Sequence, residues 1–214
     1  MCAVKIMKCF DVKAISEAVG LISKGGLVVY PTDTVYGLGC DPFNAGAVEK
    51  IFRVKGRSGK PLPILVSSIK KAEQLVDLGK VGLTLASNFW PGALTIVAPI
   101  RRGVSLPEAL TSGSEKLGVR FPNHECALRL IEGAGGFLVG TSANRSGEKP
   151  PLTVDEAVKS LKYGVDIFLD GGRVTLGKES TVLDVCGEKP VVVREGAISK
   201  DKIFGVLGTH VSSL

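Results

Sequence analysis

Four short segments concentrate the side chains that could carry out chemistry: PTDTVYGLG (31–39), KGRSGK (55–60), GTSANRSG (140–147) and GKEST (177–181). Their hydroxyl and amide groups can hydrogen-bond phosphate or ribose oxygens without bulk. The cations of the second segment can close around a polyphosphate while its glycines let backbone amides approach. Arg194, followed by Glu195 and Gly196, adds a guanidinium that can clamp an anion with a pair of N–H groups. Together these residue types predict a site for a phosphate-bearing ligand.

Two of these segments, and Arg194, also have a purely structural interpretation. The basic segment 55–60 could be a solvated run of charge. The segment 140–147 could be an Asn/Ser turn that bonds its own backbone. Arg194 could pair with a surface carboxylate. A P-loop is excluded, because the chain has no G-x-x-x-x-G-K-[ST] pattern and Lys60 is followed by Pro61.

Other catalytic chemistries lack a sequence signature. There is no G-x-S-x-G and no H-E-x-x-H, and His124 and Cys126 are spaced too closely to face each other on a helix. The other histidine, His210, is far away in the sequence. The chain has no C-x-x-C pair, which argues against a zinc ribbon, so we expect no metal site. We also expect the cysteines to be reduced thiols; they are Cys2, Cys9, Cys40, Cys126 and Cys186. The chemistry must therefore come from positioning and charge.

Composition indicates a globular α/β protein with a mild preference for anionic partners. The chain has 214 residues, 44% of them hydrophobic and 22% charged, which is enough for one large domain over residues 1–214. A net charge of +6 favours nucleotides or RNA as partners. No signal pattern and no apolar run of about 20 residues is evident, so we expect a cytoplasmic protein without a membrane partner.

Apolar spacing predicts helices alternating with strands. Asp11 and Asn44 are expected to cap the first two helices. Further helices are expected near 69–77, 79–89, 123–132, 153–162 and from 199, and strands near 27–30, 62–66, 94–98, 117–121, 137–140, 165–169, 181–185 and 191–194. The alternation is not strict, so the expected architecture is α/β, with a mixed twisted sheet covered by helices.

The polar segments and their neighbours resemble the YrdC/TsaC family of threonylcarbamoyl-AMP synthases. The resemblance runs in family order through residues 26–196 and is carried by Pro31–Gly39, Lys55-Gly56-Arg57, Phe89-Trp90-Pro91-Gly92 with Leu94-Thr95, Val119-Arg120-Phe121-Pro122, Ser142–Gly147, Asp170-Gly171-Gly172, Glu179-Ser180-Thr181-Val182 and Arg194-Glu195-Gly196. Each block alone would be weak evidence, but the ordered set is specific.

This resemblance implies a YrdC-like fold, an α/β twist like that of double-stranded-RNA-binding proteins, with a basic concave face. It also implies condensation of L-threonine, bicarbonate or CO2, and ATP, as its Mg²⁺ complex, to threonylcarbamoyl-AMP and pyrophosphate. A downstream threonylcarbamoyl-transferase complex would then modify adenosine 37 of tRNA. The chain resembles a single-domain member, without the extra C-terminal domain of longer relatives.

The resemblance also assigns roles to individual residues. The positions matching ATP-binding residues are Lys55, Arg57, Lys60, Ser142, Asn144 and Arg194. Of these, Lys55, Arg57 and Arg194 would stabilise the charge that develops during the reaction. The threonine-binding positions are Thr34, Arg120 and Ser180, with Arg120 expected to bind the substrate carboxylate. No general base emerges; Asp33 is a candidate by location, and solvent or bicarbonate is the alternative.

The chain departs from the family pattern at two places. Many relatives have a histidine after the Pro-Leu block that touches threonine, whereas this chain reads Pro61-Leu62-Pro63-Ile64-Leu65-Val66. Relatives also often have a threonine where this chain has Lys116. The rival functions are a module that binds double-stranded RNA or assists ribosome assembly without turnover, and a carbamoyl-nucleotide enzyme using another substrate such as carbamoyl phosphate. The aromatic content of 6% and the lack of basic-aromatic interleaving argue against a base-stacking surface.

Overall fold

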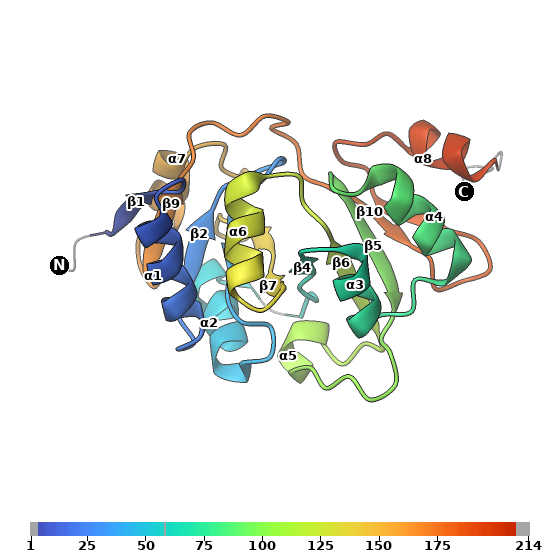
Figure 1. Ribbon diagram of the computed structural model, residues 1–214, viewed down its shortest axis with the longest axis horizontal. Helices are drawn as coiled ribbons and strands as arrows, with labels where there is room; N and C mark the ends of the chain where they lie inside the picture. The colour runs from blue at the N-terminus through green and yellow to red at the C-terminus, as the bar shows by residue number, and fades with distance from the viewer. Residues whose placement is uncertain (1–3, 58, 209–214) are drawn as a thin grey trace.

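The computed structural model describes residues 4–57 and 59–208 and has two mixed β-sheets flanked by helices (Figure 1). The helices are α1 (Val12–Ile22), α2 (Ala45–Lys55), α3 (Ile69–Leu75), α4 (Gly79–Phe89), α5 (Glu108–Thr111), α6 (Glu125–Gly133), α7 (Val154–Leu161) and α8 (Lys200–Leu207). The strands are β1 (Ile6–Lys8), β2 (Val28–Tyr30), β3 (Gly37–Gly39), β4 (Ile64–Val66), β5 (Leu94–Pro99), β6 (Lys116–Arg120), β7 (Phe137–Val139), β8 (Thr141–Ser142), β9 (Ile167–Asp170), β10 (Thr181–Asp184) and β11 (Val191–Arg194).

The two sheets divide the molecule into two halves. The five-stranded sheet has the order β1-β9-β2-β3-β8, and the six-stranded sheet has the order β11-β10-β5-β6-β4-β7. Both mix parallel and antiparallel pairs: β2 is parallel to β9 and antiparallel to β3, while β5 is parallel to β10 and antiparallel to β6. The mixed α/β expectation is confirmed, but the strands form two sheets where the sequence suggested one.

The two sheets meet where β3 approaches β7. The amide of Val139 donates to the carbonyl of Cys40 at 3.0 Å, and the Tyr30 hydroxyl donates to the Val139 carbonyl at 3.0 Å. A Cβ on Gly39 would lie only 2.5 Å from that same Val139 carbonyl oxygen. The close approach of the sheets therefore requires glycine at this position.

Capping explains where the helix that carries the basic segment begins and ends. The Asn44 side chain accepts from the Ala47 amide and starts α2, as the sequence predicted. Gly56 adopts a left-handed conformation with φ of 58° and closes the helix. Lys55 is consequently the last helical residue, and Arg57 follows directly after the turn.

The core consists of two clusters. The larger one lies against both sheets and includes Ile96 and Val119. The smaller one lies between α1, α6 and the five-stranded sheet and includes Ala18, Leu130 and Ile167. Figure 1 shows α1 and α6 side by side, in agreement with their contacts, and α4 with α8 over the six-stranded sheet. The five-stranded sheet is thus buried on both faces, by α1 and α6 on one side and by residues of α2 and α7 in the larger cluster on the other.

Most expected elements are confirmed with boundaries shifted by a few residues, and four elements were missed. The missed elements are β1, α5, β3 and β8, of which the last two lie inside segments interpreted as loops. β3 consists of Gly37, Leu38 and Gly39, and β8 has only two residues, so neither has the apolar alternation that signals a strand. Cys2 and His210 lie outside the described residues.

Candidate functional site

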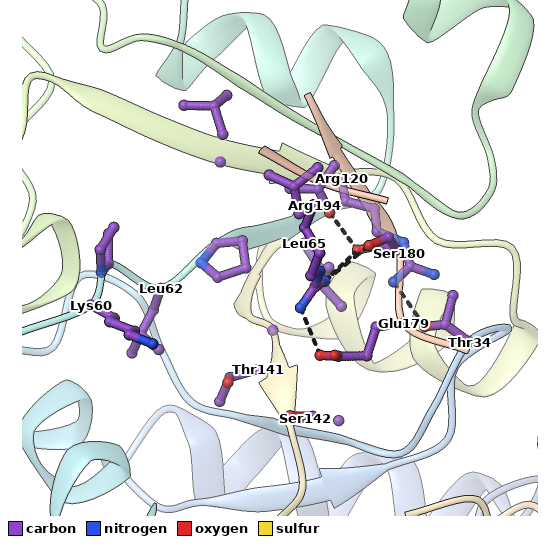
Figure 2. Close-up of a pocket in the computed structure, with 18 of the residues that line it drawn as sticks. Thr34, Lys60, Leu62, Leu65, Arg120, Thr141, Ser142, Glu179, Ser180 and Arg194 are labelled. Carbon is purple, nitrogen blue, oxygen red and sulfur yellow. Dashed lines mark hydrogen bonds and ion pairs between the residues drawn. The ribbon is translucent and has the colours of Figure 1, made fainter. Parts of the chain in front are cut away.

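Strand alternation places one face of the six-stranded sheet in the core and leaves the other as the floor of a cavity. In β5, Leu94 and Ile96 are buried, whereas Thr95 and Val97 line the cavity. The pattern recurs in β6 and β10. The cavity has a volume of about 590 Å³. Its walls come from the segment 30–37, from Arg57 and the segment 60–65, and from the strand β8, whose Thr141 and Ser142 lie across the cavity from Arg120 in Figure 2.

The predicted site residues come together. All three residues predicted for threonine line this cavity, which are Thr34, Arg120 and Ser180. A smaller adjoining cavity of about 320 Å³ is lined by all six residues predicted for ATP, which are Lys55, Arg57, Lys60, Ser142, Asn144 and Arg194. The two cavities share part of their walls, because four of these six residues also line the larger cavity: Arg57, Lys60, Ser142 and Arg194.

Arg120 is held rigidly at the buried end of the cavity. Its Nη2 donates to Asp33 Oδ1 at 2.5 Å, its Nη1 to Thr34 Oγ1 at 3.0 Å, and its Nε to the Gly92 carbonyl at 2.9 Å. A guanidinium has five N–H donors, so two are left for a ligand. Burial lowers the pKa of Arg120, while the charge of Asp33 opposes that shift. The carboxylate thus keeps the arginine charged and aimed into the cavity.

Asp33 has its own structural role. It is 6% exposed, and it is not among the residues that line the cavity. Its Oδ1 accepts from Arg120, and its Oδ2 is buried without a hydrogen-bond partner in the described part of the chain. This geometry makes Asp33 the counter-ion of Arg120.

Ser180 belongs to a small hydroxyl network that sequence reasoning only partly anticipated. Its hydroxyl lies 2.9 Å from the hydroxyl of Thr95, and its carbonyl accepts from Arg194 Nη2 at 2.9 Å. Thr95 is 4% exposed and lines the cavity, yet no role was predicted for it. The Leu94-Thr95 block of the resemblance was the available signal.

Lys55 connects the basic segment to the Ser142–Asn144 segment. Its ammonium donates to the carbonyl of Ser142 and, at 2.7 Å, to that of Asn144. Burial, together with the nearby charge of Arg57, lowers the pKa of Lys55 to about 8. The lysine therefore both orders the small cavity and adds a positive charge to its wall.

Arg57 and Asn144 present polar atoms with spare bonding capacity. Arg57 is half-buried and donates one bond, of 3.4 Å, to the Pro61 carbonyl, while its Nε is buried without a partner among the described residues. The amide nitrogen of Asn144 donates to the carbonyls of Arg145 and Glu148, and its Oδ1 is also buried without a partner there. Both groups line the small cavity and can bind a ligand.

Sequence reasoning gave no role to Glu179, which lines both cavities. Its Oε1 accepts from Arg194 Nη1 at 2.8 Å, and this ion pair is drawn in Figure 2. The motif containing Glu179 was noted, but a carboxylate is not an expected partner for phosphate. Only its position next to the cations marks Glu179 as a candidate functional residue.

Both departures from the family pattern lie in the larger cavity. Leu65 contributes apolar surface, and Lys116 forms an ion pair of 2.9 Å with Asp184. Ser114 also lines this cavity, and its hydroxyl accepts from the Lys116 amide at 3.1 Å. This chain therefore has an apolar group and an ion pair in the wall of the larger cavity.

The remaining reactive groups of the described chain lie elsewhere. Cys9, Cys40 and Cys126 are buried free thiols, and Cys186 is partly buried and free. Neither Cys126 nor His124 lines either cavity. Within residues 4–57 and 59–208, no group of three or more His, Cys, Asp or Glu could hold a metal ion. The same residues contain no helix long and apolar enough to span a bilayer.

These features define a class before any comparison: an α/β protein with a small cation-rich cavity joined to a larger cavity that has buried polar groups, such as Arg120, in its wall. Residues 20–196 match the Sua5/YciO/YrdC family, described as "Telomere recombination". The chain belongs to this family.

Three relatives illustrate the match. The chain is 37% identical over 193 residues to a threonylcarbamoyl-AMP synthase of Pyrococcus abyssi, covering 89% of this chain and 56% of that protein. It is 38% identical over 204 residues to a putative threonylcarbamoyl-AMP synthase of Mycobacterium tuberculosis, covering 94% and 93%. The solved structure of P. abyssi Sua5 complexed with L-threonine superposes with a TM-score of 0.89 at 34% identity, covering 97% of this chain and 61% of that one. The chain thus spans little more than half the length of the P. abyssi protein.

Proposed function

We propose that this protein is an L-threonylcarbamoyl-AMP synthase, which condenses L-threonine, bicarbonate or CO2, and ATP with release of pyrophosphate. The observation that carries the proposal is the meeting of nine predicted residues, from Thr34 to Arg194, in two adjoining cavities. Relatives named as threonylcarbamoyl-AMP synthases, and a similar structure that contains L-threonine, support it. In this proposal one domain supplies the whole site.

The two cavities divide the substrates between them. The small cavity, with Lys55, Arg57 and Arg194 in its wall, takes the phosphates of ATP. The larger cavity takes threonine, with the two remaining N–H donors of Arg120 on its carboxylate and Ser180 beside it. Mg²⁺ enters as part of the MgATP substrate, since this ion is usually bound through substrate phosphates and water.

The proposed reaction proceeds by displacement at the α-phosphorus. The deprotonated amine of threonine attacks CO2 to form a carbamate, and a carbamate oxygen then attacks the α-phosphorus as the bond to pyrophosphate breaks. The cations stabilise negative charge on the α-phosphate and on the leaving pyrophosphate. The walls of the cavity shield the short-lived carbamate from water. Because Asp33 is paired with Arg120, solvent or bicarbonate accepts the proton of the amine.

The product fits a role in tRNA modification. We propose that threonylcarbamoyl-AMP passes in the cytoplasm to a downstream transferase complex, which modifies adenosine 37 of tRNA. The basic concave face stays a prediction, as does direct binding of tRNA or double-stranded RNA.

The test is pyrophosphate release from MgATP by the purified protein. We expect release that requires both L-threonine and bicarbonate, together with formation of threonylcarbamoyl-AMP detected by mass spectrometry. Release that proceeds equally with carbamoyl phosphate in place of threonine and bicarbonate would favour the other carbamoyl-nucleotide enzyme. No turnover combined with tight binding of double-stranded RNA would favour the RNA-binding module.

A further inference from the structure

The carboxylate of Glu179 lies among the cations assigned to the phosphates. Three carboxylate residues of the described chain line the two cavities: Glu148, Glu179 and Asp184. Glu148 accepts from the Ser160 hydroxyl, and Asp184 pairs with Lys116. Glu179 alone of the three is bonded to one of the predicted phosphate-binding cations, Arg194, at 2.8 Å.

The field of Glu179 reaches beyond Arg194. Its negative charge raises the pKa of both Lys55 and Arg57, opposing the lowering caused by burial and by neighbouring cations. Arg57 lowers the pKa of Lys55, and Arg194 lowers that of Arg57, so the three cations repel one another. Glu179 offsets this repulsion and helps to hold the cations in one place.

We propose that Glu179 is an internal counter-ion that competes with the phosphates of the nucleotide for Arg194. This inference rests on the proposed function, because it concerns the same phosphate site. The Glu179 and Arg194 side chains are 35% and 44% exposed, and an ion pair so exposed is weak. A polyphosphate carries several charges and can accept bidentate bonds, so it displaces the carboxylate from Arg194.

Such a competitor would shape the selectivity of the site and the release of product. A ligand with one negative charge gains little binding free energy when it replaces the Glu179 carboxylate at Arg194. A triphosphate or pyrophosphate gains more, because it also reaches Lys55 and Arg57. When pyrophosphate leaves, Glu179 returns to Arg194, which lowers the affinity for that product. Glu179 is therefore a positioning residue for Arg194.

The test compares Glu179→Gln with Glu195→Gln by calorimetric titration with inorganic pyrophosphate and with ATP, first without divalent metal. Both substitutions remove one negative charge, but Glu195 is exposed, lines neither cavity and accepts from the Lys200 amide. We expect Glu179→Gln to bind pyrophosphate about two- to fivefold more tightly than wild type at low salt. The gain should shrink as salt screens the half-exposed pair, and Glu195→Gln should show much less of it. Glu179→Ala should change affinity in the same direction, which separates the loss of charge from any effect of the glutamine amide.

The possible failures are distinguishable. Equal or weaker binding of pyrophosphate by Glu179→Gln and Glu179→Ala, with binding by wild type intact, would overturn the counter-ion role alone. Weaker binding of MgATP with unchanged binding of metal-free ATP would make Glu179 a metal ligand instead, and would also overturn it. Failure of the wild-type protein to bind ATP or pyrophosphate would reject the proposed function itself.

Discussion

Around Arg120 the polar side chains are buried and bonded to one another, whereas Arg194 and its carboxylate partner Glu179 are both partly exposed to solvent. Arg120 is 5% exposed and makes three hydrogen bonds within the protein. The side chain of Arg194 is 44% exposed, and it donates to the Ser180 carbonyl and to the Glu179 carboxylate, whose side chain is 35% exposed. A buried network is preorganised for one small ligand. An exposed cluster can rearrange around a flexible polyphosphate and release it.

This contrast predicts that the largest effect on stability comes from the buried arginine. Arg120→Ala should lower the free energy of unfolding by about 3–5 kcal/mol, because it leaves the Asp33 carboxylate buried without its cation. Urea denaturation measures the loss. Arg129→Ala is the matched control, since it removes an arginine–carboxylate pair with Glu125 whose side chains are 44% and 60% exposed. That variant should lose less than about 1 kcal/mol, and equal losses in the two variants would contradict the contrast.

The partly exposed cations Arg57 and Arg194 should affect nucleotide use instead of folding. Arg57→Ala and Arg194→Ala should each weaken transition-state stabilisation toward ATP by about 1.5–3 kcal/mol, as expected for a lost charged hydrogen bond. Steady-state pyrophosphate release at varied ATP measures this, while the free energy of unfolding should change little. Unchanged ATP kinetics in both variants would reject the cation cluster as the phosphate site.

Ser180 lies between the two regions, so its variants test which substrate each region binds. Ser180→Ala should raise the KM for threonine several-fold, corresponding to about 1 kcal/mol for a neutral hydrogen bond, and leave the KM for ATP nearly unchanged. Thr95→Val should have a similar but smaller effect, because Thr95 orients the serine hydroxyl at 2.9 Å. A collapse of ATP affinity in Ser180→Ala would place the serine on the phosphate side.

The smallest predicted effect is a pH dependence caused by Lys55. Its pKa falls from the ordinary 10.5 to about 8 in the folded protein, so above about pH 8 the unfolded chain binds more protons than the folded one. The free energy of unfolding therefore rises with pH, by less than about 1 kcal/mol between about pH 7 and about pH 8.5. Denaturation of wild type and Lys55→Met over this range measures it. The rise attributable to Lys55 should vanish in the variant, and an identical slope would disprove the assignment.

Much of the fold could be predicted because the signals are local. Caps at Asp11 and Asn44 and the apolar periodicity of the helices lie within a few residues of each other, and those elements are confirmed. β3 and β8 could not be predicted in this way. They are strands because they pair with β2 and with each other, through backbone bonds between segments more than 100 residues apart in the case of Gly37 and Ser142.

The candidate site divides in the same way. The chemical types of Lys55, Arg57 and Arg194 are evident in the sequence, and the resemblance grouped them with ATP. Their partners were not evident, since the pairing of Arg120 with Asp33 and of Arg194 with Glu179 depends on where strands and loops end in space. Thr95 was missed for the same reason, because a threonine in a strand is ordinary until its neighbour is known.

The sequence by itself therefore determined which groups are available: hydroxyls, amides and cations at glycine-rich bends, and an apolar pattern able to build an α/β core. The tertiary structure decided which of these groups are buried, which are bonded to each other and which face a cavity. The physical reason is that residue type and capping act over a few neighbouring positions, whereas burial and charge pairing depend on contacts between segments distant in the chain.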